Sequence, residues 1–461
     1  MTTATQTVPT TPLVRRPQLA LAVIVTGYLM VALDTTVVTV ALPELQGDLG
    51  FSATGLSWVQ NGYMLAFGGL LLLGGRIGDL FGRRRTLVAG VGVFTIASLL
   101  GGVAMEPWQL VAARSAQGAG AALASPAMLA LIVEIFQGPA RVRALSMFSA
   151  VVGAGAAAGL LLGGFLTDAA SWRWVMFINL PIGIVVLAAA PRTLPETPRR
   201  EVRFDFAGAF LATGSALALV YGFITAADRG WPDAVTLVMF GLAAAGYTLF
   251  VLTQRSALQP VLPLRLLADR TRAFAYVNLL LVPSALFGMF FFTTQYLQQQ
   301  LHYGPMRAGL AFLPLALAQF VFVRLAPRLL ARFGARPIMI LGSLLVFGAL
   351  LWFSLIGEGD GYLEAVFGPL LLFGIGGAFS IMPLNNTVLL GVRPEEAGAA
   401  SAISQSATWT GGALGSAVLL SVYSADHGMA AGLPEVFRVA AFAFALPAVL
   451  IAILLLRPRE A

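Results

Sequence analysis

Asp34 is the side chain whose position most directly suggests chemistry. It lies within an apolar stretch that starts near residue 19 and is long enough to cross a lipid bilayer. An ionisable group there costs roughly 2.5 to 3.5 kcal/mol even on lenient insertion scales, and such groups usually mark ion or substrate paths. Burial favours the protonated carboxyl group, whereas a bound cation or a nearby arginine favours the carboxylate. Asp34 can therefore exchange a proton for a cationic compound.

Arg114 lies in another apolar stretch, which starts near residue 108. Counted at 1.5 Å per residue from the helix ends on one side of the membrane, Asp34 lies roughly 12 Å deep and Arg114 roughly 9 Å deep. The two side chains are therefore expected to reach each other. Two interpretations stay open, an ion pair that takes part in proton transfer and a static buried pair that leaves this role to another residue.

The chain is poorly supplied for other kinds of chemistry. All 28 basic residues are arginines, so the lysine of a phosphate-binding loop is missing and we expect no ATP hydrolysis. There is no cysteine, and the two histidines, His302 and His427, fall in expected loops. We therefore expect no enzyme, no metal site and no cofactor. The arginines lie in short loops between apolar stretches, where they set membrane orientation rather than bind nucleic acid.

Several polar side chains within the apolar stretches are candidates for contact with a small, lipophilic organic substrate. They are Gln60, Asn61, Tyr63, Gln295, Asn385, Asn386 and Gln405. Each has an alternative role, because polar side chains also hydrogen-bond between membrane helices for roughly 0.6 to 2 kcal/mol.

A stripe of small residues, made of Gly155, Gly159, Gly163 and Gly164, lets two helices approach closely. Packing alone is sufficient to explain it.

These side chains must be positioned by repeated apolar stretches. Of 461 residues, 58% are hydrophobic and 11% are charged, less than half the charged fraction of an ordinary soluble domain. The stretches begin near residues 19, 55, 86, 108, 142, 172, 205, 235, 271, 306, 337, 362, 398 and 435. We therefore predict an all-α integral membrane protein with fourteen transmembrane helices.

The arginines are distributed unevenly between the two sides of these helices. Most lie on the side of the N-terminus, and those on the other side are Arg173, Arg229, Arg307 and Arg438. The positive-inside rule then places both termini in the cytoplasm. The first apolar run is too long for a cleavable signal peptide. Composition indicates a bacterial genome, so the expected location is the bacterial cytoplasmic membrane.

A shift of 252 residues lays Gly82 on Gly334 and Gly159 on Gly411, which is a faint internal repeat. Transporters are commonly built from two related halves, although chance matches between glycine-rich segments are an alternative. We predict a cytoplasmic tail at 1–18, a six-helix bundle at 19–190, a cytoplasmic linker at 191–204, an inserted helix pair at 205–253, a second linker at 254–270, a second six-helix bundle at 271–456 and a tail at 457–461. The inserted pair is expected to be peripheral.

The loop after the second apolar stretch reads Gly75-Arg-Ile-Gly-Asp79-Leu-Phe-Gly82-Arg83-Arg84. It resembles the loop signature of the major facilitator superfamily. The resemblance implies the major facilitator fold and a cytoplasmic gate formed by Gly75, Asp79, Gly82, Arg83 and Arg84. The alternative is that the arginines only anchor the loop at the membrane surface.

A closer resemblance covers nearly the whole chain. The segments Asp34-Thr-Thr-Val-Val-Thr-Val-Ala-Leu-Pro43 and Trp172-Arg-Trp-Val-Met-Phe-Ile-Asn179-Leu-Pro181 are similar to segments of the fourteen-helix drug:proton antiporter family of the EmrB/QacA type. This resemblance implies proton coupling through Asp34 and Arg114. The antiporter signature has a proline before its glycine pair, and here Leu160 stands in that place.

We therefore predict a proton-coupled exporter of drugs or antibiotics, monomeric in the lipid bilayer. The departure at Leu160 leaves open a symporter or uniporter for a nutrient or an endogenous metabolite. A membrane sensor would show no substrate flux, and a membrane-embedded enzyme lacks a recognisable set of acid, base and nucleophile.

Overall fold

The computed structural model describes residues 16–196, 205–257, 260, 262–357, 359–393, 396–423 and 429–454, and helices dominate these ranges. The predicted tail at 457–461, most of the tail at 1–18, most of the linker at 191–204, and His427 lie outside the described residues. The α-helices are α1 (Pro17–Leu49), α2 (Ala53–Phe81), α3 (Arg83–Gly102), α4 (Pro107–Ile135), α5 (Gly138–Ala169), α6 (Arg173–Phe177), α7 (Asn179–Thr193), α8 (Phe206–Arg229), α9 (Ala234–Ser256), α10 (Arg265–Ala268), α11 (Arg270–Gln295), α12 (Pro305–Ala311), α13 (Leu313–Phe333), α14 (Ala335–Phe353), α15 (Gly368–Leu389), α16 (Ala397–Tyr423), α17 (Met429–Ala440) and α18 (Leu446–Leu454). Short π-helical segments η1 (Tyr296–Gln300), η2 (Leu363–Phe367) and η4 (Ala441–Ala445) extend or join them.

Acidic side chains fix several helix starts. Asp205, Asp233 and Asp269 accept hydrogen bonds from backbone N–H groups in the first turns of α8, α9 and α11. Glu106 and Gln109 form a capping box at the start of α4, where Pro107 stands at the first helical position. These local signals satisfy backbone donors that the apolar part of each helix cannot.

Twelve helical spans within the described ranges are long and apolar enough to cross a membrane, two fewer than the sequence pattern predicts. The two predicted helices outside this set are α5 and α16. Helix α5 is 32 residues long, and its second half, Ala154–Ala169, is apolar. The first half of α16 carries Ser404 and Gln405 among other polar residues, and this helix packs between α2, α8 and α11 rather than against lipid alone.

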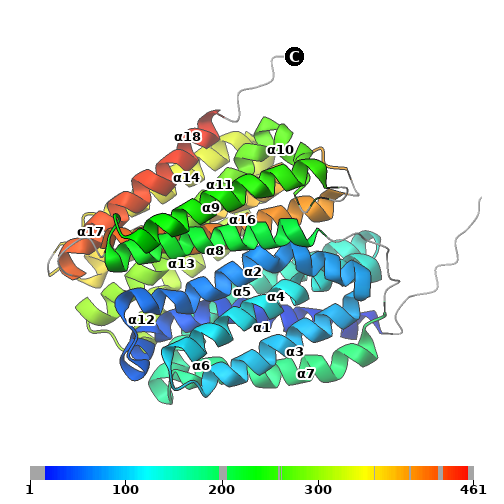
Figure 1. Ribbon diagram of the computed structural model, residues 1–461, viewed down its shortest axis with the longest axis horizontal. Helices are drawn as coiled ribbons and strands as arrows, with labels where there is room; N and C mark the ends of the chain where they lie inside the picture. The colour runs from blue at the N-terminus through cyan, green and yellow to red at the C-terminus, as the bar shows by residue number, and fades with distance from the viewer. Residues whose placement is uncertain are drawn as a thin grey trace, which may run out of the picture.

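The helices pack in three groups. In the first, α2 and α3 pack on α4, and α1 packs on α5 (Figure 1). In the second, α11 packs on α16, and α15 packs on α13 and α14. We call these the N-terminal group (α1 to α7) and the C-terminal group (α11 to α18). They meet mainly where α2 contacts α16 and where α5 contacts α12.

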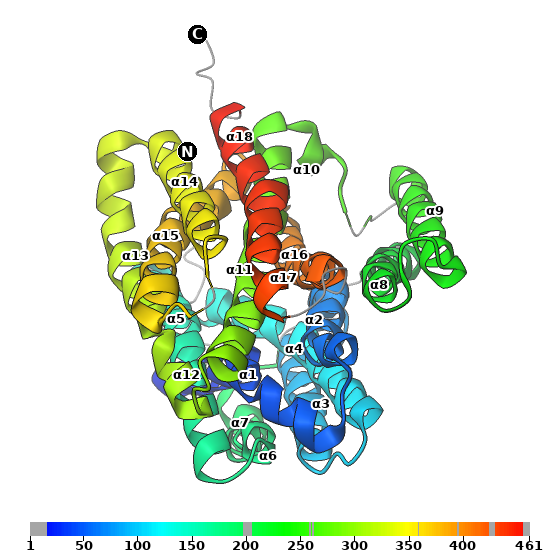
Figure 2. The ribbon, with the colours of Figure 1, turned by 90° about the vertical axis from the view of Figure 1, so that its left-hand side faces the viewer.

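The third group is the pair of α8 and α9, which stands to one side of the other helices (Figure 2). Helix α9 packs on α8 and leaves residues such as Leu237 and Leu242 more than half exposed. Helix α8 contacts α2 of the N-terminal group and α16 of the C-terminal group. The prediction of a peripheral pair therefore describes α9, whereas α8 covers the seam between the groups.

The positions related by the shift of 252 residues have similar surroundings. Gly82 ends α2 with φ +99°, and Gly334 ends α13 with φ +81°, a backbone conformation that favours glycine. Gly159 lies against the backbone of α1, as Gly411 lies against the backbone of α11. Both tight turns and both close helix pairs thus recur in the two groups.

Candidate functional site

Asp34 and Arg114 form an ion pair inside the N-terminal group. Arg114 Nη1 donates to Asp34 Oδ2 at 2.5 Å, and the exposed fractions of the two side chains are 2% and 0%. Asp34 comes from the middle of α1 and Arg114 from the first half of α4. The depth count made from the sequence placed these residues near each other, and the structure brings them into contact.

Two amide side chains that sequence reasoning did not single out complete this site. Asp34 Oδ1 accepts from Gln117 Nε2 at 3.0 Å and from Asn179 Nδ2 at 2.8 Å. Both amides also donate to the hydroxyl of Ser98 on α3. Gln117 stands three residues after Arg114, so it faces the same side of α4. Asn179 stands in a segment quoted above for its family resemblance, but nothing in the sequence indicated that it faces Asp34.

Arg114 is also held by contacts that do not involve Asp34. Its Nε donates to the carbonyl of Val59 at 3.1 Å, and Nη1 donates to Gln117 Oε1 at 2.9 Å. Its guanidinium lies 4.4 Å from the ring centroid of Tyr63, a cation–π arrangement. The guanidinium is therefore held by Val59, Gln117 and Tyr63 as well as by the carboxylate.

Tyr63 connects this buried pair to the C-terminal group. Its ring centroid lies 6.1 Å from that of Trp409 on α16 and 5.8 Å from that of Phe67. Trp409 stacks on Phe67 at 4.7 Å and contacts Phe287 of α11 at 5.7 Å. The Tyr63 hydroxyl is buried and has no hydrogen-bond partner among the described residues. These four rings form an aromatic cluster across the seam between the groups.

The predicted substrate-contact residues of α2 are buried close to the site. Gln60 donates to Thr39 of α1 at 3.0 Å, and Asn61 accepts from Ser416 of α16 at 2.7 Å. Gln60 Oε1 and Asn61 Nδ2 each lack a partner among the described residues. Each amide therefore keeps one free hydrogen-bonding atom at the junction of helices.

The other predicted substrate-contact residues lie apart from this set. Gln295 pairs with Gln299 at the end of α11. Asn385 and Asn386 are exposed on the last turns of α15, where Asn385 donates to a carbonyl of its own helix. Gln405 is exposed on α16. The seven candidates therefore do not form one cluster.

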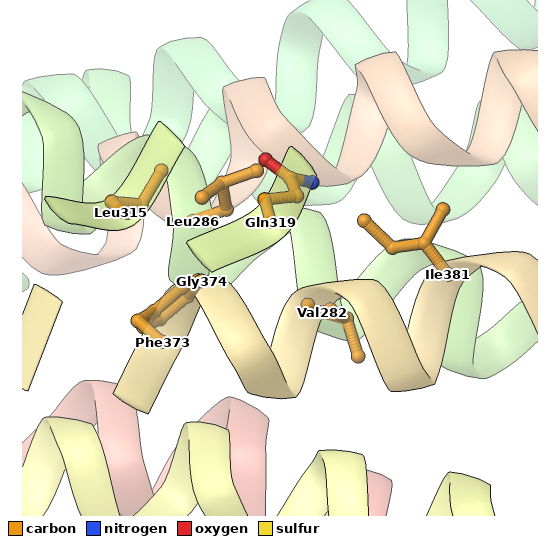
Figure 3. A pocket seen from close by; sticks show the side chains of 8 residues that line it. Val282, Leu286, Leu315, Gln319, Phe373, Gly374 and Ile381 are labelled. Atoms are coloured by element: carbon orange, nitrogen blue, oxygen red, sulfur yellow. The ribbon is translucent and has the colours of Figure 1, made fainter. Parts of the chain in front are cut away.

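A pocket within the C-terminal group contains a glutamine that the sequence analysis did not name. It is lined by residues of α11, α13 and α15 (Figure 3), namely Val282, Leu286, Leu315, Gln319, Phe373, Gly374, Gly377 and Ile381. Gln319 carries the polar side chain in this lining, and it is partly buried. A single glutamine in an apolar helix gives no signal that it faces a pocket.

The predicted gate residues bind within the N-terminal group. Arg83 pairs with Asp79 at 3.2 Å and with Glu134 near the end of α4 at 3.0 Å. Arg84 pairs with Glu196 after α7 at 2.9 Å. Glu134 is thus an ion-pair partner of the loop. These contacts tie the α2–α3 turn to the ends of α4 and α7.

The remaining predicted glycines lie where helices approach closely. A side chain at Gly155 or Gly159 would collide with α1, and one at Gly163 would meet the backbone at Val37. Gly164 lies instead against the backbone of Pro305 at the start of α12, so the stripe also faces the C-terminal group. Gly75 has only Pro126 nearby, at 3.7 Å from a built Cβ atom.

Solved structures with this arrangement of helices are transporters. A D-xylose-proton symporter superposes with a TM-score of 0.67 at 16% identity, covering 95% of this chain and 96% of the other. A POT family transporter in complex with a thioalcohol conjugated peptide superposes with a TM-score of 0.71 at 13% identity, with coverage of 95% and 96%. At these identities the likeness shows the fold alone.

Several proteins are more similar to this chain in sequence than these solved structures are. The chain is 43% identical over 422 residues to the puromycin resistance protein of Streptomyces alboniger, which covers 88% of this chain and 83% of that protein. It is 40% identical to the cephamycin export protein CmcT of Amycolatopsis lactamdurans, with coverage of 87% and 84%. It is 36% identical to the multidrug resistance protein Stp of Mycobacterium tuberculosis, with coverage of 87% and 74%.

A family model described as Major Facilitator Superfamily matches residues 24–416. This match covers the N-terminal group from residue 24, the pair of α8 and α9, and the C-terminal group as far as residue 416 in α16. The chain therefore belongs to the Major Facilitator Superfamily.

Proposed function

We propose that this protein exports small, lipophilic drug or antibiotic molecules from the cytoplasm in exchange for protons. Membership of a transporter family makes the chain a multi-pass membrane transporter rather than an enzyme. Relatives named for resistance to or export of puromycin, cephamycin and several drugs support the substrate class. The observation that carries the proton coupling is the buried pair of Asp34 and Arg114.

The proposed coupling step is the binding of one proton at Asp34. The carboxylate takes the proton, its charge is neutralised, and its ion pair with Arg114 is lost. Breaking a buried pair by removing one charge costs roughly 3 to 5 kcal/mol, because the other charge stays uncompensated. The protonated state is therefore higher in free energy, and release of the proton on the other side of the membrane restores the ion pair. The substrate is exported in the half of the transport cycle that does not carry the proton.

The proton gradient supplies enough free energy for this exchange. Inward movement of one charge yields about 2.3 kcal/mol per 100 mV of membrane potential. Since 1.4 kcal/mol corresponds to one decade of concentration, one proton per uncharged substrate supports more than tenfold accumulation. No ATP is needed.

The proposed topology has fourteen membrane-crossing helices. Helix α5 packs on α1, and α16 packs on α11 and α2, and each of these neighbours is long and apolar enough to cross a membrane. The two groups then correspond to six-helix halves at 19–190 and 271–456, with the pair at 205–253 between them. The arginine bias of the loops supports cytoplasmic termini in a bacterial cytoplasmic membrane. A monomer is sufficient, since the buried pair lies within one chain.

In this topology the structure is closed on the outer side. Gly164 of α5 approaches Pro305 of α12, and Gln298 donates to the carbonyl of Val40 on α1 at 2.7 Å. The opposite ends of α5 and α13 carry exposed apolar residues such as Val142 and Phe333. We assign these ends to an opening toward the cytoplasm, from which an exporter loads its substrate.

The test is ethidium uptake into inverted membrane vesicles with an acid interior, for the native chain and for Asp34→Asn. We expect gradient-driven uptake by the native chain and its loss in the variant, because asparagine cannot bind and release the proton. Equal uptake by both would place the coupling site elsewhere. Substrate movement in the same direction as protons would instead support the symporter that Leu160 leaves open.

A further inference from the structure

Three arginines form a stripe along the second half of α13. Arg324, Arg328 and Arg332 follow one another at intervals of four residues, so they share one side of the helix. All three are exposed, and none forms an ion pair or a hydrogen bond with a described residue. The sequence holds no acidic residue between Asp269 and Glu358. We call these three residues the arginine stripe.

The helices that pack on α13 do not neutralise the stripe either. Helices α14 and α15 contain no acidic residue, and α5 contains Asp168 alone, at its opposite end. Most other arginines of known surroundings have a partner, as Arg83 has in Asp79 and Arg438 has in Glu435. The arginine stripe is therefore an uncompensated block of positive charge.

The stripe faces away from the C-terminal group. Phe322 contacts the ring of Phe379 on α15 at 5.5 Å, and Ala326 is buried in the same cluster. Arg324 and Arg328 each stand two residues further on, which is about 200° around the helix. Figure 2 shows α13 at the edge of the C-terminal group. The surroundings of the protein, rather than its core, must supply a counter-charge.

The stripe begins within the expected hydrocarbon region. The span Pro305–Phe333 has 29 residues and is about 43 Å long, enough to cross the hydrocarbon and both headgroup layers. Counted back from Phe333, Arg332 and Arg328 lie within about 8 Å of the end, and Arg324 lies about 14 Å from it. The Arg324 guanidinium lies over the ring of Phe320, 3.8 Å from its centroid. A charge at this depth is unfavourable without a counter-ion.

The internal repeat shows that the stripe is particular to the second half of the chain. Under the shift of 252 residues, two of its arginines correspond to leucines of α2, Leu72 and Leu80. Asp79, which binds Arg83 in the first half, corresponds to Ala331. Membrane orientation requires basic residues near this end, but it does not require them to share one side of a helix.

We propose that the arginine stripe binds the headgroup of an anionic phospholipid, which lies in the cytoplasmic leaflet in the proposed topology. Guanidinium groups bind phosphate oxygens through charge-assisted hydrogen bonds. A phosphate bound at Arg328 lies one helical turn, about 6 Å, from Arg324, within reach of its long side chain. Leu317 and Val321 are exposed on the same side of α13, further from this end, and contact the acyl chains. The lipid is thus distinct from the transported molecule.

The test is native mass spectrometry of the purified chain in detergent, titrated with phosphatidylglycerol or with phosphatidylcholine of the same acyl chains. We expect a lower Kd for phosphatidylglycerol. Changing the three arginines of the stripe to glutamine should remove this preference, at about fivefold in Kd for each, which corresponds to about 1 kcal/mol per basic residue near an anionic surface. The three changes to lysine keep the charge and should keep most of the preference.

The matched control is a triple glutamine variant of Arg255, Arg270 and Arg393. These arginines are also exposed, and they belong to α9, α11 and the segment after α15, so they form no stripe. The control changes the net charge by the same amount and should keep the native preference. Size-exclusion chromatography checks that each variant is folded and monodisperse.

Three outcomes would overturn the lipid assignment. They are equal Kd values of the native chain for both lipids, an equal loss of preference in the control variant, and displacement of phosphatidylglycerol by inorganic phosphate at the same concentration. The last outcome would assign the stripe to a free anion. Lipid binding is measured without transport, so failure of gradient-driven ethidium uptake would overturn the proposed function and leave the lipid assignment standing.

Discussion

The surroundings of Asp34 bear on the two interpretations that its sequence position allows. A static ion pair needs only the acid and the arginine. Here Gln117 and Asn179 also donate to the carboxylate, and Arg114 is held by Val59 and Tyr63 independently. Protonation can therefore remove the charge of Asp34 without releasing Arg114 from its place. This favours a site that is charged and discharged during a cycle.

Tyr63 gives a prediction at the scale of single residues, because the contacts of this side chain are made by its ring. The ring supports Arg114 and contacts Trp409, whereas the hydroxyl has no partner in the described part of the chain. Tyr63→Phe should therefore keep native proton-driven uptake. Tyr63→Leu removes the cation–π contact, which contributes roughly 0.5 to 2 kcal/mol, and should slow uptake about two- to thirtyfold.

The measurement is the initial rate of ethidium uptake in inverted vesicles across a series of imposed pH gradients. Tyr221→Leu is the matched control, since Tyr221 of α8 is 41% exposed and contacts Trp58 rather than Arg114. A native rate for Tyr63→Leu at every gradient would exclude Tyr63 from the coupling between the groups.

Sequence reasoning reached some of these residues and not others for a physical reason. The depth of Asp34 and Arg114 follows from counting along two helices, so their pairing was predictable. Whether Tyr63 faces α16, or Gln319 faces a pocket, depends on packing between helices far apart in the sequence. Periodicity along one helix does not determine which neighbour covers which face.

At the scale of helices, α2 is where three groups meet. The carbonyl of Gly68 accepts from Ser406 of α16 at 2.8 Å, and the carbonyl of Gly69 accepts from Thr213 of α8 at 2.9 Å. The two glycines lack side chains, which lets Trp409 and Thr213 lie directly against α2. The inserted pair is thus attached at the point where the two halves touch.

Thr213 tests whether this attachment matters for transport. Thr213→Val removes one hydrogen bond between helices and should lower stability by roughly 0.6 kcal/mol, with transport retained. Thr213→Phe places a ring where a built Cβ atom of Gly69 already meets Thr213 at 2.6 to 3.0 Å, so α8 must move away from α2. We expect a lower maximal uptake rate with an unchanged KM for Thr213→Phe.

The measurements are thermal unfolding in detergent and uptake kinetics in vesicles. Thr248→Phe is the matched control, because Thr248 of α9 is exposed and bonds within its own helix. Native kinetics for Thr213→Phe would mean that the pair only accompanies the halves. Hydropathy predicts a helix pair at 205–253 but not its attachment, since hydropathy counts helices without placing them.

At the scale of the whole molecule, the repeat explains why the fold was predictable. Each half packs a glycine stripe of one helix against the backbone of another. Gly159 and Gly163 of α5 lie against α1, and Gly411 and Gly415 of α16 lie against α11. Such pairs follow from spacing in the sequence. The contact of α5 with α12 does not, because it depends on the relative position of the halves, which differs between the states of a transporter.

The closure between the halves can be tested because the chain has no cysteine of its own. A Cβ atom built on Gly304 lies 3.5 Å from Asp168 Oδ1, so Asp168→Cys with Gly304→Cys places two thiols close together when the outer side is closed. An oxidant should then form a disulfide across the seam, stop ethidium uptake, and allow its return after reduction.

The matched control pair is Val142→Cys with Phe333→Cys, at the opposite ends of α5 and α13, about 40 Å away at 1.5 Å per residue. We expect little cross-linking of this control pair in the resting protein. If the control pair cross-links while the first does not, the resting state is closed toward the cytoplasm instead. If the first pair cross-links without loss of uptake, the halves do not separate at α5 and α12 during transport.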